Sequence, residues 1–127
     1  MSENSRRFER RYARDQANEC LRFLSRRTWR VVYIDMFNRP KSCRPYDLSP
    51  GAVGTCDYEE KTLFIDYRHD VMSTLIHELI HARYPNKTEK EVGRLEKLIM
   101  RYLTPGQAVQ LHLAMSAVLD TPDEQDE

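Results

Sequence analysis

With 127 residues, 40% hydrophobic and 31% charged, the chain is long enough for one small core and too short for two. Twenty Lys and Arg residues balance twenty Asp and Glu residues, which argues against a generally polybasic protein that binds nucleic acid or membranes. The charge is nevertheless uneven, because residues 1–30 hold nine arginines and four acids, whereas residues 120–127 hold five acids and no base. We expect one domain over residues 1–119 and a disordered acidic tail over residues 120–127.

The sequence shows no signal for a membrane or for secretion. No apolar run approaches the roughly 20 residues of a membrane span, and no apolar stretch follows the arginine-rich start. Cys20, Cys43 and Cys56 form no C-x-x-C pair, which fits neither a disulfide framework nor a cysteine-based zinc ribbon. We therefore expect a cytoplasmic protein with no membrane contact, with a single Cys43–Cys56 bridge as the alternative to three free thiols.

The first periodic segment is residues 5–26, where apolar residues recur at helical spacing and arginines occupy the other side. The spacing predicts an amphipathic helix. Its expected apolar face consists of Phe8, Tyr12, Ala17, Cys20, Leu21 and Leu24.

Short β-type segments follow this helix. Residues 29–36 are β-branched and aromatic and predict a strand, and the three prolines and two glycines of residues 39–54 predict a loop. Residues 53–58 and 61–66 predict a hairpin, so we expect a small, mostly antiparallel sheet of three strands. Strand 61–66 could also bind an extended peptide along its edge, unless both of its edges are already paired.

The second half of the chain predicts three helices. Asp70 is a good N-cap for a buried helix that stops before Pro85. Thr88, with Glu91 three residues later, predicts a capping box at the start of the next helix. Residues 104–106, Thr-Pro-Gly, then break the chain before a last helix over residues 107–119. The predicted fold class is therefore α+β.

The run His77-Glu78-Leu79-Ile80-His81 lies within the buried helix. Residues four apart share a helix face, so His77 and His81 can bind one Zn²⁺ ion. Glu78 would then lie beside a zinc-bound water and accept its proton as the water attacks a carbonyl. A chance pairing of two histidines is the alternative, but burying these groups without partners is costly, which favours the metal.

Residues 74–82, TLIHELIHA, preceded by the strand-like segment 61–66, resemble the zincin metallopeptidases. The brevity of the chain, and the run HARYP at residues 81–85 before an acidic helix start, resemble the small single-domain zincin-like proteins of bacteriophages and prophages and the minimal gluzincins. The resemblance covers residues 51–103, and H-E-x-x-H is its specific part. It implies a minimal zincin-like domain: an N-terminal helix, a three-stranded sheet, the active-site helix and a glutamate-bearing helix. It also implies a peptidase that acts on a peptide or protein substrate.

A zinc site needs a third protein ligand. Tyr84 and Lys87 stand where a metzincin would have glycine and histidine, so that class is excluded. In the gluzincin pattern a glutamate of the next helix completes the site, and Glu89 matches the acidic position of the phage-type sequences. Glu89 can also reach back across the turn at Pro85, so we predict it as the third ligand. The alternatives are Glu91, which the capping box explains, Glu96 and, further along the chain, His112.

Two further features allow two interpretations. Tyr84, close after His81, is a candidate donor to the oxyanion of a tetrahedral intermediate, or else it packs at the helix end. The arginine-rich first helix could contact DNA or an acidic partner, or pair with the acidic tail of the chain itself. The leading hypothesis is a zinc metallopeptidase with Glu78 as general base. The alternative is a catalytically silent module of the same fold that docks on DNA or on a protein through its first helix.

Overall fold

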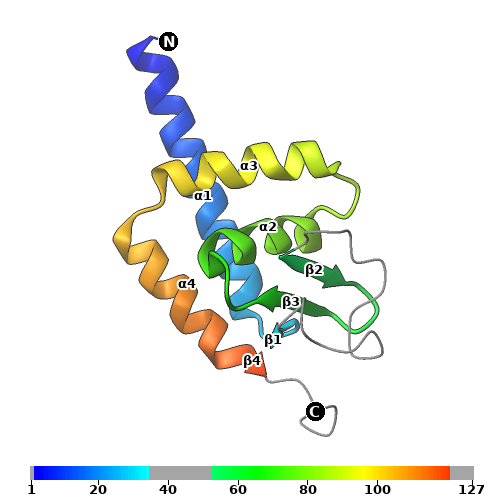
Figure 1. The fold of residues 1–127 in the computed structure, drawn as a ribbon. Helices are drawn as coiled ribbons and strands as arrows, with labels where there is room; N and C mark the ends of the chain where they lie inside the picture. Colours follow the sequence, from blue (N-terminus) through cyan, green and yellow to red (C-terminus); the bar gives the residue numbers. More distant parts are fainter. Residues whose placement is uncertain (1, 35–52, 121–127) are drawn as a thin grey trace, which may run out of the picture.

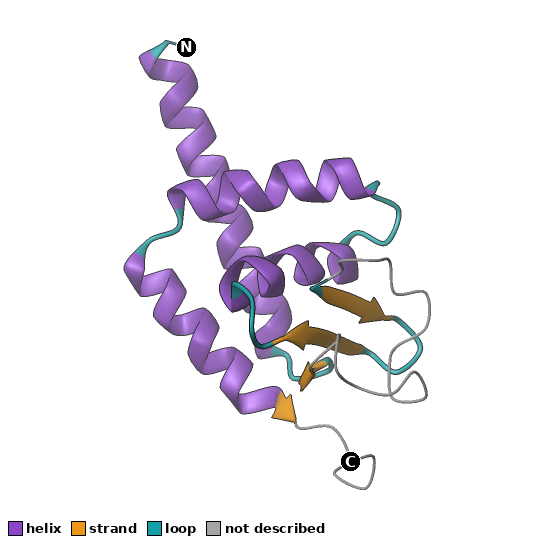
Figure 2. Ribbon diagram, viewed as in Figure 1, coloured by secondary structure: helices purple, strands orange, loops and turns teal. Residues whose placement is uncertain are grey.

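The structure, a computed structural model, describes residues 2–34 and 53–120. Its fold is α+β, with four helices gathered against a small sheet (Figures 1 and 2). In chain order the elements are α1 (Glu3–Ser25), β1 (Arg30–Ile34), β2 (Gly54–Asp57), β3 (Thr62–Asp66), α2 (Val71–Arg83), α3 (Glu89–Tyr102), α4 (Pro105–Val118) and β4 (Leu119–Asp120).

The sheet has the strand order β2-β3-β1-β4. The predicted hairpin is confirmed, because β2 and β3 pair antiparallel with Cys56 opposite Leu63. The expectation of a mostly antiparallel, three-stranded sheet is wrong: β1 pairs parallel with β3 and also parallel with the two-residue strand β4. A tight turn forces antiparallel pairing only on the strands that it joins, whereas β1 reaches β3 and β4 through long connections, which permit parallel pairing.

Strand β3 lies inside the sheet, with β2 on one side and β1 on the other. A peptide therefore cannot be added along the segment 61–66, and that interpretation is wrong. Among the described strands, β2 stands at the edge and pairs on one side only.

The main core lies between the sheet and the helices. Helix α2 packs over β2 and β3 and contacts α1 and α3, whereas α4 packs against α1 and β1. Leu63 and Ile65 of β3 and Val31 of β1 face this core, because alternate residues of a strand point to the same side. The α2 residues that meet them are fully buried: Leu75, Ile76, Leu79 and Ile80. Val32, Ile34 and Phe64 form a separate cluster on the opposite face of the sheet.

Helix α1 is confirmed, but its apolar face is narrower than predicted. Ala17, Cys20 and Leu24 are buried as expected, together with Ala13. Phe8 and Tyr12 are exposed, Phe8 to 73%, and they stack on each other instead of on the core. Nine residues separate Phe8 from Ala17, which at 3.6 residues per turn places them about 180° apart on the helix. The first half of α1 projects away from the body of the molecule (Figure 1).

The ends of the later helices follow their capping residues. Asp70 caps α2 by accepting a hydrogen bond from the backbone N–H of Ser73, and the capping box of Thr88 and Glu91 starts α3. Helix α4 begins at Pro105, two residues earlier than predicted, because Thr104 and Gln107 form a second capping box. Proline fits the first turn of a helix, where its missing N–H is not needed.

The acidic end of the chain lies only partly within the described residues. Asp120 belongs to β4, and Arg30 of β1 donates a hydrogen bond to its carboxylate at 3.1 Å. The remaining residues of the predicted acidic tail, and most of the predicted loop 39–54 with Cys43, lie outside the described residues. Within the part of the chain that the structure describes, no helix is long and apolar enough to cross a membrane.

Candidate metal centre

Helix α2 presents His77 and His81 on the same side. Both imidazoles are about four-fifths buried, with side-chain exposures of 20% and 18%, and their ring centroids lie 5.0 Å apart. The spacing of four residues produces this pairing, since one helical turn separates the two side chains. The apolar neighbours Leu79 and Ile80 fix the orientation by packing into the core.

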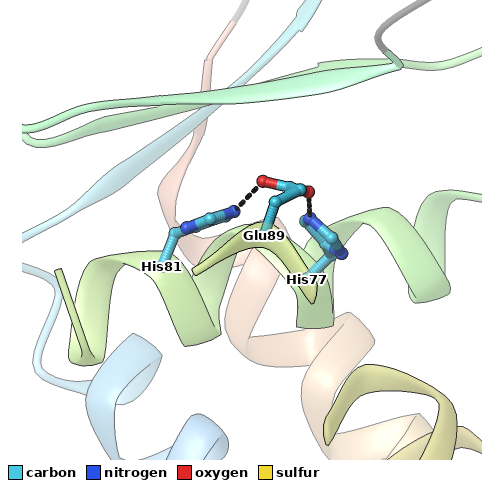
Figure 3. Close-up of side chains that lie close together, drawn as sticks. All are labelled: His77, His81 and Glu89. Carbon is cyan, nitrogen blue, oxygen red and sulfur yellow. Dashed lines mark hydrogen bonds and ion pairs between the residues drawn. The ribbon is translucent and has the colours of Figure 1, made fainter. Parts of the chain in front are cut away.

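Glu89 meets both histidines from the first turn of α3 (Figure 3). Its two carboxylate oxygens lie 2.5 Å from Nε2 of His77 and 2.9 Å from Nε2 of His81. The turn after α2 brings the start of α3 back alongside α2. Glu89 therefore lies next to His77 and His81, although it follows them by twelve and eight residues in the chain. One ligand atom from each of the three side chains lies within 4.8 Å of the others, so the group could hold a metal ion. The predicted set His77, His81 and Glu89 is thus brought together.

The charges around Glu89 agree with this arrangement. Partial burial raises the pKa of Glu89, but hydrogen bonds with His77 and His81 and the charges of both imidazoles outweigh the burial, so the pKa is lowered overall. Glu89 therefore stays ionised and available as an anionic ligand.

Glu96 lies behind His77, two turns along α3 from Glu89. Its Oε1 is 3.4 Å from Nδ1 of His77, and its Oε2 accepts a hydrogen bond of 3.0 Å from the hydroxyl of Ser73. Glu96 thus contacts the nitrogen of His77 that faces away from Glu89. Sequence spacing left Glu96 as an alternative ligand, whereas the structure places it at the opposite nitrogen of the imidazole.

Glu78, the residue after His77 on α2, is buried, with 5% of its surface exposed. Its carboxylate lies against Gly54 of β2: a Cβ added at Gly54 would be 3.0 Å from Oε2 of Glu78. Burial raises the pKa of Glu78 to about 7, with the charge of His77 opposing the rise and that of Glu89 adding to it. A carboxyl group with a pKa near neutrality can both accept and release a proton.

Other predicted candidates have different surroundings. The hydroxyl of Tyr84 accepts a hydrogen bond of 3.1 Å from Arg83, which also contacts Gln16 and Cys20 of α1. A role of Tyr84 as oxyanion donor stays a prediction. Glu91 is occupied in the capping box, and His112 is exposed on α4.

Tyr58 is a contact that the sequence did not reveal. Its hydroxyl donates a hydrogen bond of 2.8 Å to the backbone carbonyl of His81, and its ring packs edge-on against Trp29. This bond ties the segment after β2 to the last turn of α2. A tyrosine that binds a backbone carbonyl leaves no spacing signal, so the sequence offered no means of finding it.

In comparisons with known proteins, no family model, no curated protein and no solved structure matches this chain.

Proposed function

We propose that this chain is a zinc-dependent hydrolase, a small metallopeptidase of the zincin type. The observation that carries the proposal is the convergence of His77, His81 and Glu89 beside the buried carboxyl group of Glu78. Two imidazole nitrogens and one carboxylate oxygen are a donor set that catalytic zinc sites use.

The surroundings of the donor set support zinc rather than a simple ion pair. Glu96 lies at Nδ1 of His77, and a hydrogen bond there leaves Nε2 free to act as a ligand. Carboxylates behind metal-binding histidines commonly fix the tautomer and the ring orientation in this way. When bound, zinc would polarise a carbonyl oxygen and lower the pKa of a water molecule.

The residues of the chain have separate roles in this proposal. His77, His81 and Glu89 would hold the metal, and Glu96 and Ser73 orient His77. Glu78 accepts a proton from the attacking water and passes it to the departing amine nitrogen. Its pKa of about 7 in the buried site suits both transfers.

A peptide is the substrate class that the sheet favours. Gly54 of the edge strand β2 lies against Glu78, and among the described residues no strand pairs with the outer side of β2. An extended peptide that pairs along this edge would pass close to Glu78.

Substitution of Glu78 tests the proposal directly. Glu78→Gln should keep the bound zinc and reduce the cleavage of a fluorescent peptide library by at least about a hundredfold, because the amide accepts no proton. Glu60→Gln, which changes an exposed glutamate in the β2–β3 turn, is the matched control and should keep full activity. Equal cleavage by both variants would contradict the proposal and favour the catalytically silent binding module.

A further inference from the structure

The first half of α1 is an arm that contributes nothing to the core. Residues 2–12 include no buried residue, and the arm extends beyond the rest of the molecule (Figure 1). Five arginines lie on or next to it: Arg6, Arg7, Arg10, Arg11 and Arg14. Arg7 forms an exposed ion pair with Glu3, and among the described residues Arg6, Arg10 and Arg11 form none.

The outer side of α3 carries a second row of cations. These side chains are spaced by three or four residues, so they lie in line on one face of the helix. All of them are exposed, and none forms an ion pair within the described part of the chain: Lys90, Arg94, Lys97 and Arg101. The buried residues Val92, Leu95 and Ile99 occupy the opposite face of α3. Over its eleven-residue span the row is about 16 Å long.

The two rows meet where α1 crosses the end of α3. The helices pack against each other, and Nε of Arg14 donates a hydrogen bond of 3.2 Å to the backbone carbonyl of Tyr102, the last residue of α3. Arg6 and Arg10 precede the buried residues Ala13 and Ala17 by seven positions each, so they lie within about 20° of the buried line of α1. They therefore point to the side on which α1 packs against the body of the molecule. We call the surface formed by Arg6, Arg10, Lys97 and Arg101 the basic corner.

We infer that the basic corner binds double-stranded DNA. Unpaired cations in two rows complement the regular phosphates of a duplex, and binding would release the counterions condensed there. An α-helix with side chains is about 10–12 Å across and the major groove of B-form DNA about 12 Å wide, so an arm that is free on all sides can enter it. The major groove of an RNA duplex is too narrow for a helix. This inference needs no metal and is independent of the proposed hydrolase.

The test compares paired charge removals on the full-length chain. A fluorescently labelled 20-base-pair DNA duplex is titrated at several salt concentrations, with anisotropy as the readout. Arg6→Gln/Arg10→Gln and Lys97→Gln/Arg101→Gln should each weaken binding about tenfold and reduce the salt slope by about 2, since each phosphate contact contributes about 0.9. The matched control is Arg26→Gln/Arg27→Gln, which removes the same charge at the far end of α1. It should change binding less than twofold.

Each outcome of this test is decisive. Circular dichroism of every variant verifies that glutamine, a good helix former, has preserved the helices. The inference is overturned if the wild-type chain does not bind the duplex, or if the control pair weakens binding as much as the two corner pairs. Tighter binding of an RNA duplex or of single-stranded DNA of the same length would also overturn it. Preference for the DNA duplex, together with loss in both corner pairs, supports it.

Discussion

Glu96 lies beside the candidate metal centre without belonging to its ligand set. It contacts Nδ1 of His77, on the side of the ring away from Glu89, and Ser73 holds its second oxygen. With a side-chain exposure of 17%, it is much less exposed than Glu89, at 73%. Low exposure and two hydrogen-bonding contacts suit a residue that orients a ligand.

Glu96→Gln should therefore weaken zinc binding while leaving the ligands in place. We expect the affinity to fall about tenfold, because a neutral amide holds the imidazole less firmly than a carboxylate does. Competition with a chromophoric chelator measures this change. The control is Glu91→Gln, in which glutamine can still close the capping box with Thr88. Wild-type affinity in Glu96→Gln would show that Glu96 does not support His77.

For the candidate metal centre, the sequence predicted which residues come together, but not every contact that these residues make. His77 and His81 follow from the helical period, and Glu89 follows from the short turn between α2 and α3. The role of Glu96 could not be predicted, because Glu89 and Glu96 lie two turns apart on the same face of α3, and spacing alone does not tell which one reaches Nε2. The contact between Tyr84 and Arg83 depends on the position of α1, which the local sequence does not determine.

The strand β2 and the helix α2 approach each other closely at Glu78. A Cβ at Gly54 would lie 2.6 Å from Cγ2 of Thr74, closer than such atoms can come, and 3.0 Å from Oε2 of Glu78. Glycine at this position lets the edge strand lie directly over α2.

Gly54→Ala should consequently destabilise the protein. We expect a loss of about 1–3 kcal/mol in the free energy of unfolding, since the methyl group must displace Thr74 or the strand. Gly93→Ala in α3 is the matched control, because nothing lies within 4 Å of its added Cβ. It should stabilise the helix by about 0.5–1 kcal/mol. Urea denaturation of both variants measures the difference, and equal stability of the two would contradict the close approach.

The elements themselves were largely predictable, because their signals are local. The caps at Asp70 and Thr88 and the turn between β2 and β3 act over three or four residues. The parallel pairing of β1 was not predictable, since its partners are brought to it by long connections. The exposure of Phe8 was not predicted, because Phe8 was assigned to the buried face from its apolar character and not from its angular position around the helix.

Helix α3 contributes residues to two different surfaces of the molecule. One side of this helix faces α2 and supplies Glu89 and Glu96 to the candidate metal centre, and the solvent side carries the cations of the basic corner. The zero net charge of the chain does not reveal this division, because residues 1–30 hold nine arginines and four acids whereas residues 120–127 hold five acids and no base. One acid near the C-terminal end, Asp120, forms an ion pair with Arg30. This pair lies at the opposite end of α1 from the arm.

We propose that His77, His81 and Glu89 form a zinc site, and the zinc content of the protein tests this proposal most directly. The purified full-length protein is incubated with zinc, dialysed, and analysed by elemental mass spectrometry beside Glu89→Gln and its control Glu91→Gln. We predict about one zinc ion per chain in the wild type and in Glu91→Gln, and a large loss in Glu89→Gln, because a catalytic site needs three protein ligands. A folded wild-type protein that retains no zinc would contradict the proposed zinc site.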